Sequence, residues 1–309
     1  MTSTTDFPSP FGDLLSMACE HAGLDATGAR LIKLTNNAVF SLARDPYVIR
    51  IAASDLVGAQ ARKAVSFAQW LAANDVPTIV PMDGLDQPFD VEGHQVTIWQ
   101  LVPSNDGRPT VRALAEILRT LHSSPGEAPD LPAWDEIGSI RRKLSAQDVL
   151  STEHLVFLTD QVDELATLLH DVDYVLPTGP IHGDAHTGSL IAGTDGTVLC
   201  DFDTAANGPR EWDLMPIAVN TARFAELTDE QDQLADEYGF DVRDWDHYDT
   251  MRRIRELQVL VAPLPILSFD AGVRTEWNLR YESIRAGNAT AVWTPWNRVD
   301  LAARSNRDA

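Results

Sequence analysis

Two carboxylates near the middle of the chain stand in settings that suit one kind of chemistry. Asp184 lies in the turn-rich segment 181–189, and Asp201 directly follows the hydrophobic run 197–200. Phosphoryl transfer needs such a pair, because one acid accepts the proton of an attacking hydroxyl and the other holds the metal ion that neutralises nucleotide phosphates. The sequence therefore predicts Asp184 as a catalytic base and Asp201 as a ligand of Mg²⁺, a cation that prefers oxygen.

The spacing around the two acids supports the same chemistry. Ser189 stands five positions after Asp184, where the kinase pattern His-Arg-Asp-x-x-x-x-Asn has an Asn that helps hold the metal. Asp201-Phe202-Asp203 stands where that pattern has its metal-binding Asp-Phe-Gly. Asp203 is thus a second candidate metal ligand, with a solvent-facing side chain as an equal alternative. A lone Gly-Asp pair would be an ordinary turn, but the joint pattern predicts a phosphoryl-transfer site.

With these residues the chain resembles the aminoglycoside phosphotransferase and choline kinase family, whose catalytic stretch reads His-Gly-Asp-x-His-x-Gly-Asn. The resemblance is close over residues 181–213 and looser over 48–102. It implies an α+β, bilobal, protein-kinase-like fold, in which a small lobe has an antiparallel sheet and one helix and a larger lobe is mainly helical. It also implies ATP as the phosphoryl donor and a hydroxyl of a small cationic molecule, aminoglycoside-like or an amino alcohol, as the acceptor.

The resemblance also implies roles for three neighbours of the acids. His182 is expected to pack beneath the loop and hydrogen-bond its backbone, so we do not take it as a base. For His186 we favour shaping the loop over touching a phosphate, because imidazole is a poor magnesium ligand. Asp213 is expected to brace the catalytic loop, with an ordinary acid at a helix start as the alternative.

The elements that must position these residues are visible as hydrophobic patterns. Residues 11–22 and 55–73 have helical periodicity. Short apolar runs within 29–51 predict three antiparallel strands, and further strands are predicted at 79–80 and 95–102. This order matches the small lobe of a kinase, which we place at residues 1–103 with its N-terminal helix, leaving 104–309 for the large lobe.

The same resemblance assigns nucleotide-binding residues in the small lobe. Arg50 occupies the place of the basic residue that the third strand of a kinase directs at the phosphates. The backbone groups of Gln100 and Val102 would bond the adenine edge at the hinge between lobes. Asn36 and Asn37 lie in the candidate nucleotide loop, which has no glycine; Asn tolerates the left-handed conformations of such a turn, and a plain hairpin explains the loop equally well.

Three departures from the kinase pattern bear on activity. Arg50 replaces Lys, which changes a compact ammonium into a planar fork that still binds phosphate. Residues 56–73 contain no acid to pair with it, and Lys63 and Ala64 stand near the expected place of a Glu. Ser189 replaces Asn with a shorter hydroxyl. A catalytically impaired, pseudokinase-like binding protein is therefore the alternative reading. A metal-dependent hydrolase is disfavoured, because the two nearby histidines lack a further cluster of ligands.

The remainder of the chain predicts a helical lobe. Helices are expected at 110–122, 152–169, 214–224, 229–238, 248–261 and 274–286. Nine acids between Asp229 and Asp249 lie where the resembling enzymes place substrate-binding helices, which fits a cationic acceptor. For most of these acids we favour the alternative, a solvated and charged surface.

Composition limits the partners and the compartment. A net charge of −22 over 309 residues disfavours binding to nucleic acid or to an anionic membrane, although it also serves solubility. The two cysteines, Cys19 and Cys200, suggest neither a disulfide framework nor a thiolate metal site. With no run of about 18 apolar residues and no export signal, a cytoplasmic location is expected. The oligomeric state is not predicted.

Overall fold

The computed structural model describes residues 11–34, 37–53, 55–104, 107–125, 131–225, 227, 229–296 and 298–299. These residues group into two compact units. The first comprises the described residues of Met1–Pro132 and Gly179–Asn207, and the second those of Ala133–Thr178 and Gly208–Ala309. Each unit is described by itself below. The lobe boundary at residue 103 stays a prediction.

The first unit is built on a five-stranded antiparallel sheet with the order β1-β2-β3-β5-β4. The strands are β1 (Arg30–Leu34), β2 (Asn37–Ser41), β3 (Tyr47–Ala52), β4 (Phe89–Val91) and β5 (His94–Gln100). The three strands predicted between residues 29 and 51 are confirmed, and β5 ends two residues before the predicted end.

One predicted strand is wrong. Residues 79–80 form no strand, and their surroundings make only isolated bridges, from Thr78 to Leu199 and from Pro81 to Trp99. The physical reason is that proline flanks this stretch at 77 and 81, and proline has no N–H to continue a ladder. The short β4 was not predicted, because three residues show no periodicity.

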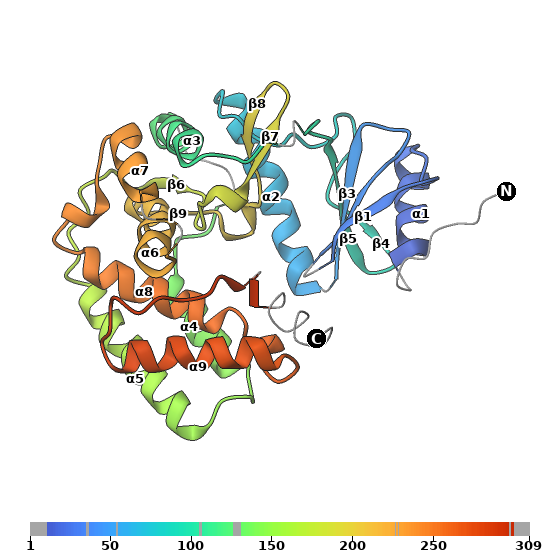
Figure 1. Ribbon diagram of the computed structural model, residues 1–309. Helices are drawn as coiled ribbons and strands as arrows, with labels where there is room; N and C mark the ends of the chain where they lie inside the picture. Colours follow the sequence, from blue (N-terminus) through green and yellow to red (C-terminus); the bar gives the residue numbers. More distant parts are fainter. Residues whose placement is uncertain are drawn as a thin grey trace, which may run out of the picture. The chain divides into compact units, whose positions relative to one another are not determined.

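Two helices, α1 (Phe11–Ala22) and α2 (Asp55–Ala73), cover opposite faces of this sheet (Figure 1). The alternation of a strand decides which residues face each helix. Ile49 and Ile51 are fully buried in a hydrophobic core that includes α1. Arg50, between them, points to the other face, where its register neighbours are Val39 and Thr97.

The first unit continues with α3 (Val111–Ser123), whose first turn is capped by Thr110 Oγ1, an acceptor from Ala113 N–H at 3.2 Å. Two small sheets follow. In one, β6 (Gly179–Ile181) pairs with β9 (Ala206–Gly208); in the other, β7 (Leu190–Gly193) pairs with β8 (Gly196–Leu199). The short 3₁₀ helices η1 (Thr187–Ser189) and η2 (Phe202–Thr204) lie beside these strands in the chain.

The second unit is helical. Its helices are α4 (Glu136–Ser145), α5 (Thr152–Leu169), α6 (Met215–Arg223), α7 (Glu230–Tyr238), α8 (Tyr248–Val261) and α9 (Ala271–Arg285), with 3₁₀ turns η3 (Arg210–Leu214), η4 (Val242–Asp244) and η5 (Leu264–Ile266). Helix α8 packs against α4, α5, α6 and α9. The helices predicted in this region are confirmed, whereas α4 was missed because its ten residues are largely polar and include Gly138.

The architecture confirms the predicted α+β class, with an antiparallel sheet and its helices in one unit and a mainly helical remainder. Among the described residues, no helix combines the length and the apolar character that crossing a membrane requires.

Candidate active site

The predicted catalytic loop runs from the end of β6 through η1, and its backbone depends on Gly183. This residue has a φ of +86°, and a Cβ placed there would lie 2.2 Å from the backbone oxygen of Thr204. Only glycine fits both the left-handed conformation and this close approach. The contact shows that the loop before Asp184 is pressed against the segment that follows Asp201.

His182 fastens the same two segments together. Its imidazole is fully buried; Nε2 lies 2.9 Å from Cys200 O, and Nδ1 lies 3.3 Å from Asp184 N. Because an amide N–H can only donate, Nδ1 accepts and the proton belongs on Nε2, which then donates to Cys200 O. His182 therefore holds the backbone of the loop, as the resemblance implied, and is not available as a base.

Ser189 closes the loop behind Asp184. Its hydroxyl donates to Asp184 O at 3.0 Å, and its own carbonyl accepts from Cys200 N–H at 2.8 Å. The residue is only 2% exposed. The loop that carries Asp184 is thus hydrogen-bonded through Ser189 to the residue directly before Asp201, and the two predicted acids are brought to one place in the first unit.

His186 shapes the loop on its outer side. Its Nδ1 accepts from Gly188 N–H at 2.9 Å, and its Nε2 lies 3.8 Å from Asp184 Oδ2. Both side chains are more than a third exposed. The Asp184 side chain is therefore partly exposed, although its Oδ1 is buried. A base that takes a proton from a bound hydroxyl needs such access.

Asp201 is aimed by a turn in an unusual conformation. It has a φ of 71° in the left-handed region, and the next residue, Phe202, is buried against Phe67 and His182 with ring centroids 5.5 Å and 5.8 Å away. Non-glycine residues adopt this conformation uncommonly, and it often marks functional sites. The buried phenyl ring anchors the turn, and the Asp201 side chain stays exposed.

The structure corrects the expectation that Arg50 lacks an acidic partner. Arg50 Nη2 donates to both carboxylate oxygens of Asp203, at 2.7 and 2.6 Å. An acidic partner was expected in α2. The partner instead lies in the turn that follows Asp201, 153 residues after Arg50 in the chain. Arg50 and Asp203, predicted to bind nucleotide and metal respectively, therefore hold each other in this structure.

Lys63 of α2 hydrogen-bonds the backbone of the same turn. Its Nζ donates to Asp203 O at 2.6 Å and to Ala205 O at 3.0 Å. Burial lowers the pKa of its ammonium, an effect that the Asp203 charge opposes. In the kinase pattern the carboxylate that pairs with the basic residue of β3 comes from the helix, whereas here it comes from the turn, and the helix contributes a lysine that bonds the backbone of that turn. The only sequence signal for this was a lysine near the place of the missing Glu.

The predicted metal ligands fit a hard cation in their chemistry. Asp201, Asp203 and Ser189 all offer oxygen, and a carboxylate bound by one guanidinium keeps further lone pairs. Within the part of the chain that the structure describes, no three His, Cys, Asp or Glu side chains are grouped closely enough to hold a metal ion. Mg²⁺ commonly uses one or two carboxylates together with water and substrate phosphates, so two acids and a hydroxyl suffice.

The residues assigned to nucleotide binding fall into two groups. Asn37 and Arg50 line one small cavity with Ala64. Gln100 and Val102 line another, of about 300 Å³, together with the β7–β8 turn. The N–H of Gln100 donates to Val80 O at 2.8 Å and is engaged within the protein, so its carbonyl is the group left for an adenine edge. Asn36 lies outside the described residues.

Two further expectations concern the second unit. Asp213 is fully buried, and its bracing role stays a prediction. In the acidic stretch, Arg243 forms ion pairs with Asp232 and Asp241, and Arg252 pairs with Asp249. These three acids are already engaged with arginines, which weakens the argument that the stretch was built to attract a cationic molecule.

Comparisons with known proteins give one family and one fold. The sequence model of the phosphotransferase enzyme family (APH) matches residues 32–257. No curated protein sequence matches the chain. The known structures described next are 14–17% identical to it, so that their likeness concerns the fold.

Three structures illustrate the likeness. The amicoumacin kinase hAmiN, in complex with AMP-PNP, Ca²⁺ and Ami, has a TM-score of 0.67 at 14% identity, over 90% of this chain and 95% of that one. A choline/ethanolamine kinase family protein from Mesorhizobium loti has a TM-score of 0.62 at 14% identity, over 88% and 94%. Spectinomycin phosphotransferase APH(9)-Ia, in complex with ADP and spectinomycin, has a TM-score of 0.59 at 17% identity, over 96% and 98%.

Proposed function

The chain belongs to the phosphotransferase enzyme family, and we propose that it transfers the γ-phosphoryl group of ATP to a hydroxyl of a small, cationic molecule. The observation that carries the proposal is the hydrogen-bonded connection between the loop of Asp184 and the strand end of Asp201, through Ser189 and His182. Phosphoryl transfer is catalysed mainly by positioning and electrostatics, and a base held next to a metal ligand would serve both.

Each residue of the site has a distinct task. Asp184 orients the acceptor hydroxyl and takes its proton as the new bond forms, which needs no strongly raised pKa. Asp201, Ser189 and Asp203 would hold Mg²⁺, which when bound neutralises charge on the nucleotide phosphates. Arg50 places its guanidinium next to the same turn and supplies a donor fork for a phosphate.

The proposed acceptor class rests on charge and on the family resemblance. The net charge of −22 attracts cations in general, and relatives with this fold bind compounds such as spectinomycin. Since Asp232, Asp241 and Asp249 are paired with arginines, the proposed acceptor class rests on the net charge and on the family resemblance rather than on these acids.

Calorimetry first tests whether the protein binds a nucleotide as the phosphoryl donor. ATP and GTP are titrated with and without Mg²⁺, and transfer is then measured over a panel of aminoglycosides, aminocyclitols, amino sugars and choline-like alcohols. We expect nucleotide binding in the micromolar to millimolar range typical of enzyme substrates. Asp184→Asn should leave that binding in place and lower the rate of transfer by about 10²- to 10⁴-fold, the usual contribution of a general base. A protein that binds neither nucleotide refutes the proposal.

A second reading, a binding protein with impaired transfer, is favoured by one observation. The hydroxyl of Ser189 and the carboxylate of Asp203 are both engaged within the protein, so a metal would have to share them. Ser189→Asn separates the two functions. A protein that has drifted away from catalysis gains metal affinity or turnover when the amide of the family pattern is restored, whereas an enzyme adapted to serine gains neither.

A further inference from the structure

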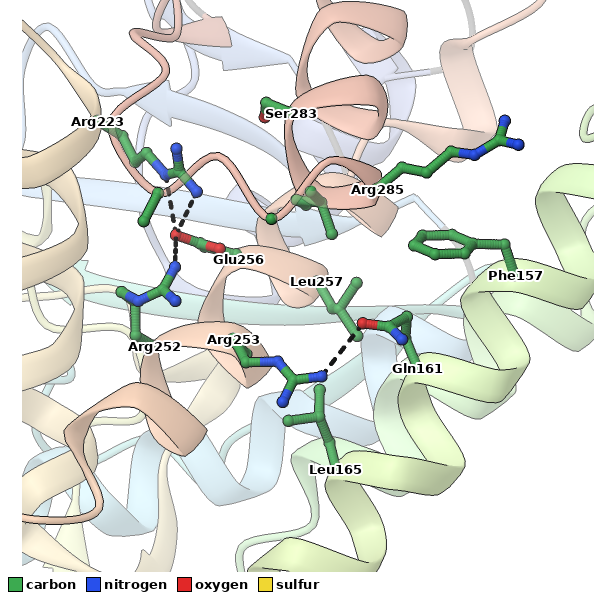
Figure 2. A pocket seen from close by; sticks show the side chains of 13 residues that line it. Phe157, Gln161, Leu165, Arg223, Arg252, Arg253, Glu256, Leu257, Ser283 and Arg285 are labelled. Atoms are coloured by element: carbon green, nitrogen blue, oxygen red, sulfur yellow. Dashed lines mark hydrogen bonds and ion pairs between the residues drawn. The ribbon is translucent and has the colours of Figure 1, made fainter.

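A cavity of about 260 Å³ lies among the helices of the second unit and is lined by four arginines but only one carboxylate (Figure 2). It is bordered by α5, α8, α9 and the end of α6. The arginines are Arg223, Arg252, Arg253 and Arg285, and the carboxylate is Glu256. The residues that line the cavity carry a positive net charge, although the whole chain has a net charge of −22.

The inner wall of the cavity carries surplus positive charge. Glu256 Oε1 accepts from Arg223 Nε at 2.8 Å and from Arg252 Nη1 at 2.6 Å, and Figure 2 shows the two guanidinium groups meeting the carboxylate from opposite sides. All three side chains are largely buried, at 1%, 13% and 4% exposure for Arg223, Arg252 and Glu256. One carboxylate neutralises only one of two guanidinium groups, and a charge left over in a low dielectric favours an incoming anion.

Other contacts offset this charge, but they come from groups that do not line the cavity or that carry only partial charge. Arg223 Nη1 donates to the carbonyls of Asn288 and Ala291, which supply partial charge only. Arg252 also pairs with Asp249, but that carboxylate is 70% exposed and is screened by water.

The two remaining arginines are held loosely enough to reach a ligand. Arg253 pairs with Glu164, and Arg285 pairs with Glu153, carboxylates that are 50% and 68% exposed. Exposed pairs of this kind contribute little free energy, so either arginine can exchange its partner for a better one. Arg253 also donates to Gln161 Oε1, across the lower part of the cavity in Figure 2.

From these observations we propose that the cavity is a binding site for a small oxyanion, with a phosphate group as its ligand. Guanidinium groups recognise phosphate oxygens through paired N–H donors, and arginine keeps its charge when buried. The volume admits inorganic phosphate with water, or the phosphate of a small monoester. The site is built by the second unit alone and repels the cationic acceptor proposed above, so it is distinct from the residues around Asp184.

Titration calorimetry with inorganic phosphate at constant ionic strength, and with glycerol phosphate as a monoester, tests the site. The informative variant is Arg253→Gln combined with Arg285→Gln, which leaves the buried Arg223–Glu256 pair intact. The matched control is Arg141→Gln combined with Arg142→Gln. Those arginines form exposed ion pairs in the same unit and do not line the cavity.

We expect saturable binding of phosphate by the natural protein, weakened about tenfold or more in the cavity variant and less than about twofold in the control. Tighter binding of glycerol phosphate than of phosphate would identify a monoester as the ligand, and the reverse order would identify the free ion. No saturable binding, an unaffected cavity variant, or equal weakening in the control would each overturn the proposal. Because ATP binding is measured separately, failure here is distinguishable from failure of the proposed phosphotransferase activity.

Discussion

The ion pair between Arg50 and Asp203 leads to a quantitative prediction about how the candidate site is held together. Arg50 Nη2 lies 2.6–2.7 Å from both oxygens of Asp203, and the two side chains are 21% and 26% exposed. Fully exposed pairs contribute about 0.2–1 kcal/mol, whereas breaking a buried pair costs about 3–5 kcal/mol. With short, charge-assisted contacts and partial exposure, we expect a coupling free energy of about 1–2 kcal/mol between these residues.

A double-mutant cycle measures this coupling. Arg50→Gln, Asp203→Asn and the double variant are unfolded in urea, and the free energies of unfolding are compared with that of the natural protein. Asp195→Asn is the matched control, because Asp195 is an exposed carboxylate of the β7–β8 turn in the same unit. A coupling below about 0.5 kcal/mol, the usual error of additivity, would show that the ion pair does not stabilise the folded protein.

The same variants separate the two roles assigned to Asp203. If Asp203 is a metal ligand as well as the partner of Arg50, Asp203→Asn lowers the ratio of ATP affinity with Mg²⁺ to that without it. Arg50→Gln leaves this ratio unchanged and weakens ATP binding under both conditions, since the lost contact is with the phosphates themselves. If the ratio of ATP affinities with and without Mg²⁺ is unchanged in both variants, Asp203 holds Arg50 in place and does not bind the metal.

The other predictions concern the glycine of the catalytic loop, the lysine of α2 and a buried thiol. Gly183→Ala should lower the free energy of unfolding by more than about 2 kcal/mol in urea, because its Cβ would lie 2.2 Å from a backbone oxygen, whereas Gly84→Ala, with a similar φ and open space, should cost about 1 kcal/mol. Lys63→Met should cost about 1–3 kcal/mol, because it removes both hydrogen bonds to backbone carbonyls, and the exposed neighbour Arg62→Met should cost less than about 0.5 kcal/mol. Burial, and secondarily the charge of the adjacent acid, raises the pKa of Cys200 from 9.0 to about 12. The unfolded chain therefore loses this proton first, so the contribution of Cys200 to stability is constant below pH 9 and falls between pH 9 and 12; Cys200→Ala should show a shallower loss of stability in that range.

Most of the helices and strands, and the choice of Asp184 and Asp201 as candidate site residues, followed from the sequence. Helices such as α2 and α5 were predicted to the residue, because their apolar periodicity is local and their ends are marked by turn-forming residues. Asp184 and Asp201 could be selected because their motif is contiguous and its spacing is fixed by a loop, a short strand and a turn. The short β4 and the largely polar α4 carried no such local signal.

Which charged side chains contact one another depends on how distant segments pack in three dimensions. Arg50, Lys63 and Asp203 lie far apart in the chain, and their contacts arise because β3, α2 and the turn after β8 fold onto one another. The same holds for the arginine-lined cavity, whose residues come mainly from four helices and carry no shared motif. Periodicity reports how each segment faces a core, but hydrogen bonds and ion pairs act over a few ångströms in space, and long-range packing alone sets those distances.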